Sequence, residues 1–200
     1  MEKSIFIREA GAPLTWGNGL SAAWRLDMRH KSSLALAAAL AVFPLGSAIA
    51  QVNQSGYSLP LALAVKAATK AIATCASNGY PVSAVIVDTS GVIKLEAKGD
   101  HSTILTTTSA FRKAYTVVTF GPIFRFDASS TFAALAAKNP SGAALATLPD
   151  VALLPGGVAI KAGDEIVAAL GIGGSPGGDK DEACAQAGVE SIKDDIARSR

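Results

Sequence analysis

Residues 156–188 read GGVAIKAGDEIVAALGIGGSPGGDKDEACAQAG. Two strand-like segments, residues 158–161 and 165–172, flank the turn Ala162-Gly163-Asp164 and predict a β-hairpin. A glycine-rich bend at residues 171–178 follows, and glycine is required where the backbone adopts a positive φ or approaches a neighbour closely. We therefore expect either a ligand or another backbone segment to lie against this bend.

A C-terminal helix over residues 179–198 is expected after the bend. Three acids occupy its first turn, namely Asp179, Asp181 and Glu182. Negative side chains there complement the helix dipole and repel a phosphate, and Asp179 stands where a phosphate-binding loop requires lysine. The acids favour a self-capped structural bend. The apolar stripe expected to face the core comprises Ala185, Val189, Ile192 and Ile196.

The chain before this stretch alternates between helical and strand patterns. Apolar residues at helical spacing predict a first helix that ends near Asn78-Gly79; these residues are Leu61, Val65, Ala68, Ile72 and Cys75. A second β-hairpin is expected from residues 81–87 and 92–97, joined by the turn Asp88-Thr-Ser-Gly91.

Two more helices are expected before the last hairpin. Residues 103–120 form the first, capped by Ser102 or Thr103 and broken by Gly121-Pro122. Residues 129–137 form a shorter helix, and residues 141–149 are interpreted as a loop.

The first fifty residues have the features of a secretory leader. Met28-Arg-His-Lys31 is a basic segment, residues 34–45 are apolar, and Ala48-Ile-Ala50 is the small-x-small pattern of a cleavage site. We predict a start at Met28, cleavage after Ala50, and a mature domain over residues 51–200 in the periplasm or outside the cell. The apolar run is shorter than the roughly 20 residues of a membrane span.

Removal of the leader makes the mature domain electrically neutral. Residues 1–50 contain five of the 18 Lys and Arg residues and three of the 16 Asp and Glu residues, which leaves 13 of each. A neutral domain lacks the basic surplus that drives nucleic-acid binding, so we predict no nucleic-acid partner and no stable membrane insertion after cleavage.

Cysteine and histidine limit the metal chemistry that is available. The mature domain holds two cysteines, Cys75 and Cys184, each on or beside an inward face, and an exported protein can join them in a disulfide. Two buried thiols are the alternative. With His101 as the single histidine after residue 50, a zinc site is hard to assemble. A haem iron would find His101 or a tyrosine among Tyr57, Tyr80 and Tyr115.

Five stretches of the chain are characteristic when taken together. The most specific is residues 169–188, ALGIGGSPGGDKDEACAQAG. The others are ATCASNGY at residues 73–80, VSAVIVD at 82–88, KAYT at 113–116 and GGVAI at 156–160. With these stretches the chain resembles the GlcG/HbpS-like haem-binding family, also called the haem-degrading domain family. The resemblance implies a single α/β (α+β) domain of profilin-like or roadblock-like type, with a largely antiparallel sheet flanked by helices, that assembles into homo-oligomers.

The resemblance also implies a ligand, haem, and an exported haem-binding protein that assists haem or redox sensing or haem handling. A pocket is expected between residues 100–116 and the Gly156-Gly157 strand, with His101 as the iron ligand. The expected cofactor contacts are His101, Arg112, Lys113, Tyr115, Thr116, Gly156 and Gly157. Two alternatives stay open: an enzyme that acts on haem or a small hydroxy acid, with Asp100 and His101 as acid and base, and an oligomeric partner of a membrane sensor. We favour a binding protein without turnover.

Overall fold

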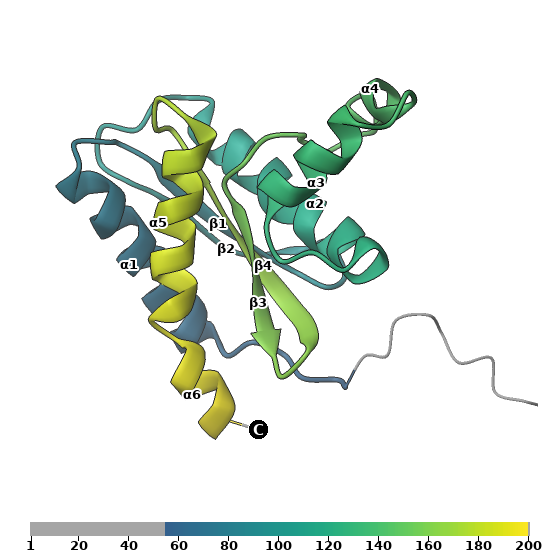
Figure 1. The fold of residues 1–200 in the computed structure, drawn as a ribbon. Coiled ribbons are helices and arrows are strands. Elements are labelled where there is room, and N and C mark those ends of the chain that lie inside the picture. The colour runs from purple at the N-terminus through teal and green to yellow at the C-terminus, as the bar shows by residue number, and fades with distance from the viewer. Residues whose placement is uncertain (1–54, 200) are drawn as a thin grey trace, which may run out of the picture. The chain divides into compact units, whose positions relative to one another are not determined.

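The computed structural model describes residues 55–199, which form a four-stranded antiparallel sheet with helices on both faces (Figure 1). This confirms the predicted fold class. The predicted leader, the start at Met28 and the cleavage after Ala50 lie outside the described residues.

Two β-hairpins build the sheet, and their inner strands pair with each other. The strands are β1 (Ser83–Asp88), β2 (Ile93–Lys98), β3 (Gly157–Ala162) and β4 (Glu165–Gly173), in the order β2-β1-β4-β3. The central pairing runs antiparallel from Ser83 opposite Gly173 to Asp88 opposite Ala168. Both hairpins were predicted from their turns, where Gly91 and Gly163 adopt positive φ angles of 78° and 66°.

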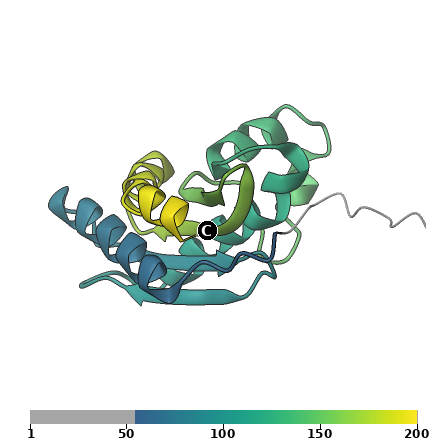
Figure 2. The same cartoon turned by 90° about the horizontal axis from the view of Figure 1, so that it is seen from below.

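The helices divide between the two faces of the sheet (Figures 1 and 2). Helices α1 (Leu61–Ser77) and α5 (Gly178–Glu190) lie side by side on one face, over a core that includes Ile86, Ile160 and Leu170. Helix α2 (Thr106–Phe124) covers the other face, over Val85, Val87 and Ala169. The shorter helices are α3 (Ser129–Ala137), α4 (Gly142–Leu145) and α6 (Lys193–Arg198).

Backbone of another element lies against the glycine-rich bend. A Cβ atom at Gly171 would lie 1.9 Å from the carbonyl oxygen of Ala110, and one at Gly173 would lie 2.6 Å from that of Thr106. Both oxygens belong to α2, so these glycines allow the helix to approach the sheet closely.

The buried face of α1 differs from the predicted one. The helix has the predicted extent, but Leu61 and Val65 are 58% and 42% exposed. The face against the core consists mainly of alanine, with Ala64, Ala67, Ala68, Ala71 and Cys75 buried. Small side chains are needed because α5 packs closely here: a Cβ at Gly188 would lie 2.6 Å from the carbonyl oxygen of Ala67.

Helix boundaries differ from the prediction at four places. Helix α2 begins at Thr106 after Leu105, without a side-chain cap bond, so neither Ser102 nor Thr103 caps it. It continues through Pro122 to Phe124, and the following Arg125 adopts a left-handed conformation (φ 55°), with its N–H donating to the carbonyl of Gly121. The predicted C-terminal helix is interrupted and forms two helices, α5 and α6. At the break, the N–H of Ile192 donates to the carbonyl of Val189 three residues earlier, which is the pattern of a 3₁₀ turn and not of an α-helix. The predicted loop at residues 141–149 contains the single turn α4.

A disulfide joins Cys75 of α1 to Cys184 of α5, with their Cα atoms 5.6 Å apart. The two residues are separated by 109 positions, so the bridge closes most of the domain. It ties together the two helices that share one face of the sheet, and a cross-link of that span stabilises chiefly by restricting the unfolded chain.

Candidate functional site

A buried ion pair lies where α2, α5 and the sheet meet. The ammonium of Lys113 is 2.5 Å from Oδ2 of Asp181, and their side chains are 4% and 3% exposed. The same ammonium donates to the carbonyl of Ile172 at 3.0 Å. The Lys113 ammonium is therefore neutralised and hydrogen-bonded by groups of the protein itself, which a buried cation requires.

Asp181 also organises the loop before its own helix. Its Oδ1 accepts hydrogen bonds from the N–H and the hydroxyl of Ser175, at 3.0 and 2.6 Å. The predicted structural bend is thus held by an acid of the helix that follows it, although the N-cap residue itself is Gly177 and supplies no side-chain cap. The acid binds the loop and a lysine of another helix.

The neighbouring strand must approach this pair without a side chain. Gly156 adopts a φ of 123°, and a Cβ there would lie 2.9 Å from Cβ of Asp181 and from Cδ and Nζ of Lys113. A Cβ at Gly157 would lie 2.4 Å from the carbonyl oxygen of Lys113. Both glycines are thus explained by close approach to Lys113.

Further polar side chains fix residues 151–157 against the helices. Arg112 donates to the carbonyl of Val151 at 2.6 Å, and the Thr116 hydroxyl accepts from the N–H of Ala152 at 2.9 Å. Glu182 accepts from the N–H of Gly156 at 3.2 Å and from the Ser130 hydroxyl at 2.6 Å. The structure therefore brings five predicted contact residues together around residues 151–157: Lys113, Thr116, Gly156 and Gly157, which are buried, and Arg112, which is half-buried.

His101 lies on an exposed turn before α2. It has a φ of 61°, which is uncommon for a residue other than glycine. Behind it, the buried Ser83 hydroxyl bonds to those of Ser102 and Thr106 at 3.1 and 2.7 Å and anchors the turn. Ile104 and Leu105 are 92% and 67% exposed, so the imidazole has an apolar surface beside it in the chain.

Tyr115 lies further along α2 and lines a cavity of about 290 Å³. Thr119, Ile123 and the hairpin residue Gly91 share this cavity. Nine residues separate Thr106 from Tyr115, which corresponds to about 14 Å of helix at 1.5 Å per residue. His101 and Tyr115 therefore belong to different parts of the surface, and the pocket expected between residues 100–116 and Gly156-Gly157 stays a prediction.

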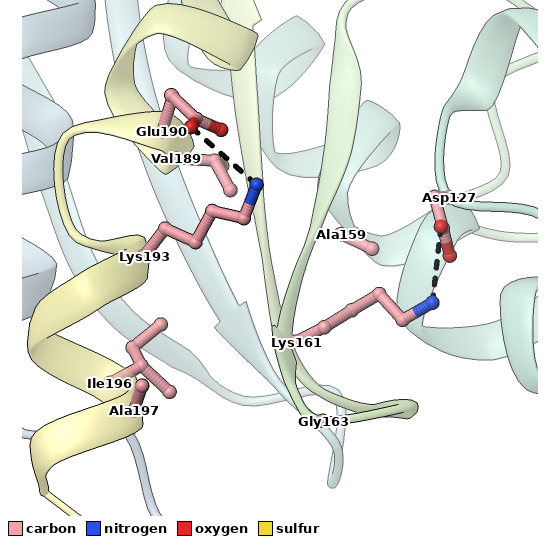
Figure 3. A pocket seen from close by; sticks show the side chains of 9 residues that line it. All are labelled: Asp127, Ala159, Lys161, Gly163, Val189, Glu190, Lys193, Ile196 and Ala197. Atoms are coloured by element: carbon pink, nitrogen blue, oxygen red, sulfur yellow. Dashed lines mark hydrogen bonds and ion pairs between the residues drawn. The ribbon is translucent and has the colours of Figure 1, made fainter.

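A larger groove, of about 560 Å³, lies beside the edge strand β3 (Figure 3). Two ion pairs stand on its sides: Lys161 with Asp127 at 3.1 Å, and Lys193 with Glu190 at 3.5 Å. The other lining residues are Ala159, Gly163, Val189, Ile196 and Ala197. Helix α6, on one side, is tied to α1 through Asp195, whose pKa is lowered chiefly by a hydrogen bond from Lys66. The sequence patterns gave no indication of this groove.

The bend contains the pattern Gly-x-Ser-x-Gly at residues 173–177, between a strand and a helix. In hydrolases this pattern presents a serine to a histidine base. Here the Ser175 hydroxyl contacts Oδ1 of Asp181 and the carbonyl of Gly177, at 2.6 and 2.8 Å. Ser175 thus contacts an aspartate and a carbonyl where a hydrolase serine would contact a histidine. Since Asp181 is also paired with Lys113, the bond from Ser175 links the loop to the ion pair.

Residues 55–199 offer neither a metal cluster nor a membrane helix. No group of three or more His, Cys, Asp or Glu side chains in this range could hold a metal ion. Likewise, none of the helices described is long and apolar enough to cross a bilayer.

Comparison with known proteins places these features in a wider group. The chain matches the family model described as "Haem degrading protein HbpS-like" over residues 59–190. The solved structure of HbpS is 33% identical, with a TM-score of 0.62 over 70% of this chain and 94% of HbpS. A double mutant of HbpS from Streptomyces reticuli is 32% identical, with a TM-score of 0.62 over 74% of this chain and 96% of that one.

A more distant structure shows the same fold. PduOC, solved in complex with haem, is 20% identical, with a TM-score of 0.58 over 68% of this chain and 96% of PduOC. No curated protein sequence matches the chain.

Proposed function

Because the chain belongs to the HbpS-like family of haem-degrading proteins, we propose that it is an exported haem-binding protein. The family match is the observation that carries this proposal. The leader pattern of residues 1–50 supports export to the periplasm or beyond. Assembly into a homo-oligomer and assistance to a haem or redox sensor belong to the same proposal.

His101 is the residue that we propose to ligate the iron. Proteins hold haem iron mainly through His, Cys, Met or Tyr. The described residues contain no Met, and Cys75 and Cys184 are joined in a disulfide. His101 is exposed and can reach a ligand, whereas Tyr115 is part-buried against Phe111, with ring centroids 5.6 Å apart. A bound haem would supply redox chemistry and a strong visible absorption.

The surroundings of His101 suit a flat apolar ligand. The buried hydroxyls of Ser83, Ser102 and Thr106 hold the turn in place, and exposed Ile104 and Leu105 offer apolar contact. The remaining predicted contacts stay predictions. A contact from Lys113 would require its bond to Asp181 to open, and one from Arg112 would compete with the carbonyl of Val151.

Haem titration of the purified protein tests this assignment. We expect a saturable Soret band whose position and affinity change in His101→Gly, a substitution that suits the φ of 61° and so preserves the turn. Thr103→Ala, at an exposed neighbouring position, is the matched control and should bind like the wild type. Free imidazole should restore the wild-type spectrum in His101→Gly. An identical spectrum and affinity in His101→Gly would remove His101 as the ligand, and a wild type without saturable binding would remove the proposed function.

Turnover is the second candidate, and the family description favours it. In this reading Asp100 and His101, which are adjacent on the exposed turn, act as acid and base toward haem or a small hydroxy acid. Loss of the Soret band under reductant and oxygen, with a product identified by mass, would distinguish an enzyme from a binder. A stable Soret band under the same conditions would support binding alone.

A further inference from the structure

The groove at the edge of β3 combines an apolar floor with cations on both sides. Strand β3 is the last strand of the sheet on its side, and its outer edge is bonded at Val158 and Ala159 by the short segment Asp127-Ala128. Ala159, Val189, Ile196 and Ala197 supply apolar surface. Its volume of about 560 Å³ falls within the range of 300–1,000 Å³ that is usual for small-molecule sites.

The two lysines of the groove come from different elements. Lys161 extends from β3 toward Asp127, and Lys193 extends from the start of α6 toward Glu190, as Figure 3 shows. Exposed ion pairs of this kind contribute little to stability. A ligand carboxylate can therefore take the place of Asp127 or Glu190 at small cost, and two carboxylates can engage both lysines.

The groove has no good ligand for a haem iron. None of its nine described lining residues is His, Cys, Met or Tyr. A compound held there is held by its periphery, through carboxylates on the lysines and an apolar body on the floor. The groove is also separate from the turn of His101, since no residue of that turn lines it.

We propose that this groove is a second site, which binds an iron-free tetrapyrrole that carries two carboxylates. The choice of tetrapyrrole rests on the proposed function, because a protein that handles haem encounters porphyrins and their opened, iron-free forms. The two-carboxylate requirement rests on Lys161 and Lys193 alone. The groove favours an iron-free tetrapyrrole over haem for one reason, which is that none of its described lining residues is a good ligand for the iron.

Binding of protoporphyrin IX and of biliverdin, followed by fluorescence and absorption, tests the site in the purified protein. The double variant Lys161→Gln/Lys193→Gln should raise Kd about three- to twentyfold, the range for the loss of two partly exposed ion pairs. The control Lys70→Gln/Lys98→Gln changes the net charge equally at exposed positions on α1 and β2 and should leave Kd unchanged. Equal weakening in both double variants would overturn the proposal.

Two further variants test the sign of the charge effect and the use of the floor. Asp127→Asn/Glu190→Gln frees both lysines and should tighten binding, and Ala197→Trp at an exposed lining position should block the groove without altering its charges. Succinate, which has two carboxylates but a short body, should fail to compete at millimolar concentration. Weaker binding in the first variant, unchanged binding in the second, or effective competition by succinate would each overturn the site.

The two sites fail separately. His101→Gly should leave porphyrin binding unchanged, while Lys161→Gln/Lys193→Gln should keep the Soret shift of His101-bound haem. If His101→Gly abolishes porphyrin binding as well, there is one site and the groove is not it. If the wild type binds porphyrin but not haem, the groove survives and the proposed function does not.

Discussion

Breaking the ion pair between Lys113 and Asp181 from one side should be among the most destabilising single changes in this domain. We consider Asp181→Asn, which keeps the shape of the side chain and leaves an amide oxygen to accept from Ser175. The substitution removes the charge 2.5 Å from the Lys113 ammonium and leaves that cation buried with only the carbonyl of Ile172. Removing one member of a buried pair costs about 3–5 kcal/mol.

A loss of this size is readily measured. With an m value of about 2 kcal/mol/M, a loss of about 4 kcal/mol moves the urea midpoint down by about 2 M. Far-UV circular dichroism is the suitable signal, because both tryptophans, Trp16 and Trp24, lie before residues 55–199, which form the domain described. The disulfide should be kept intact during the measurement, and an unchanged m value would show that the effect is on stability.

Two comparisons make the result decisive. Asp127→Asn removes an acid from an exposed ion pair with Lys161 and should cost less than about 1 kcal/mol. Lys113→Met/Asp181→Leu removes both buried charges and should be more stable than Asp181→Asn, because no unpaired charge remains. The reasoning is refuted if Asp181→Asn costs no more than Asp127→Asn, or if the double variant is as unstable as the sum of its single changes.

Two further predictions concern a glycine beside this pair and the disulfide. Gly156→Ala should destabilise the domain by about 2 kcal/mol or more, since its Cβ would lie 2.9 Å from Asp181 and Lys113 at a φ of 123°. The control Gly79→Ala has a φ of 77° and no atom within 4 Å of the added Cβ, so it should cost about 1 kcal/mol. Thermal or urea unfolding measures both losses. Equal losses would mean that strain alone, without the close approach, explains Gly156. Cys75→Ser/Cys184→Ser should lose about 2–5 kcal/mol, and thiol titration of the denatured, unreduced wild type should find no free thiol; two titratable thiols would contradict the bridge.

Local signals predicted the strands better than the faces of the helices. Each hairpin has a turn with glycine at the position that needs a positive φ, so its sequence identifies it without tertiary information. The face of α1 depends instead on which residues allow α5 to approach, and alanine does so better than Leu61 or Val65. Hydrophobicity ranks leucine and valine above alanine, so periodicity correctly placed Ala68 and Cys75 in the buried face but wrongly added Leu61 and Val65 to it.

The buried pair Lys113 and Asp181 could have been predicted from the helical periodicity of the sequence. Lys113 stands three residues after Ala110 and four before Val117, on the buried stripe of α2. Asp181 stands four residues before Ala185, on the buried stripe of α5. A charge on each of two apolar stripes indicates a buried pair, because neither is stable there alone. The groove left no such signal, since its residues come from β3, α5, α6 and the loop after α2 and only the fold brings them together.

The buried ion pair restricts where a haem-binding protein of this fold can recognise the carboxylates of its ligand. A carboxylate that took Lys113 would leave Asp181 buried beside Ser175 without a cation, at a cost comparable to that of breaking the pair. Arg112 is likewise engaged with the carbonyl of Val151. Cations whose present partners are solvent-exposed carry no such cost, and Lys161 and Lys193 are two of these. Carboxylate recognition should therefore depend on the surface lysines, while Lys113 and Asp181 hold together the helices and strand that position His101 and the groove.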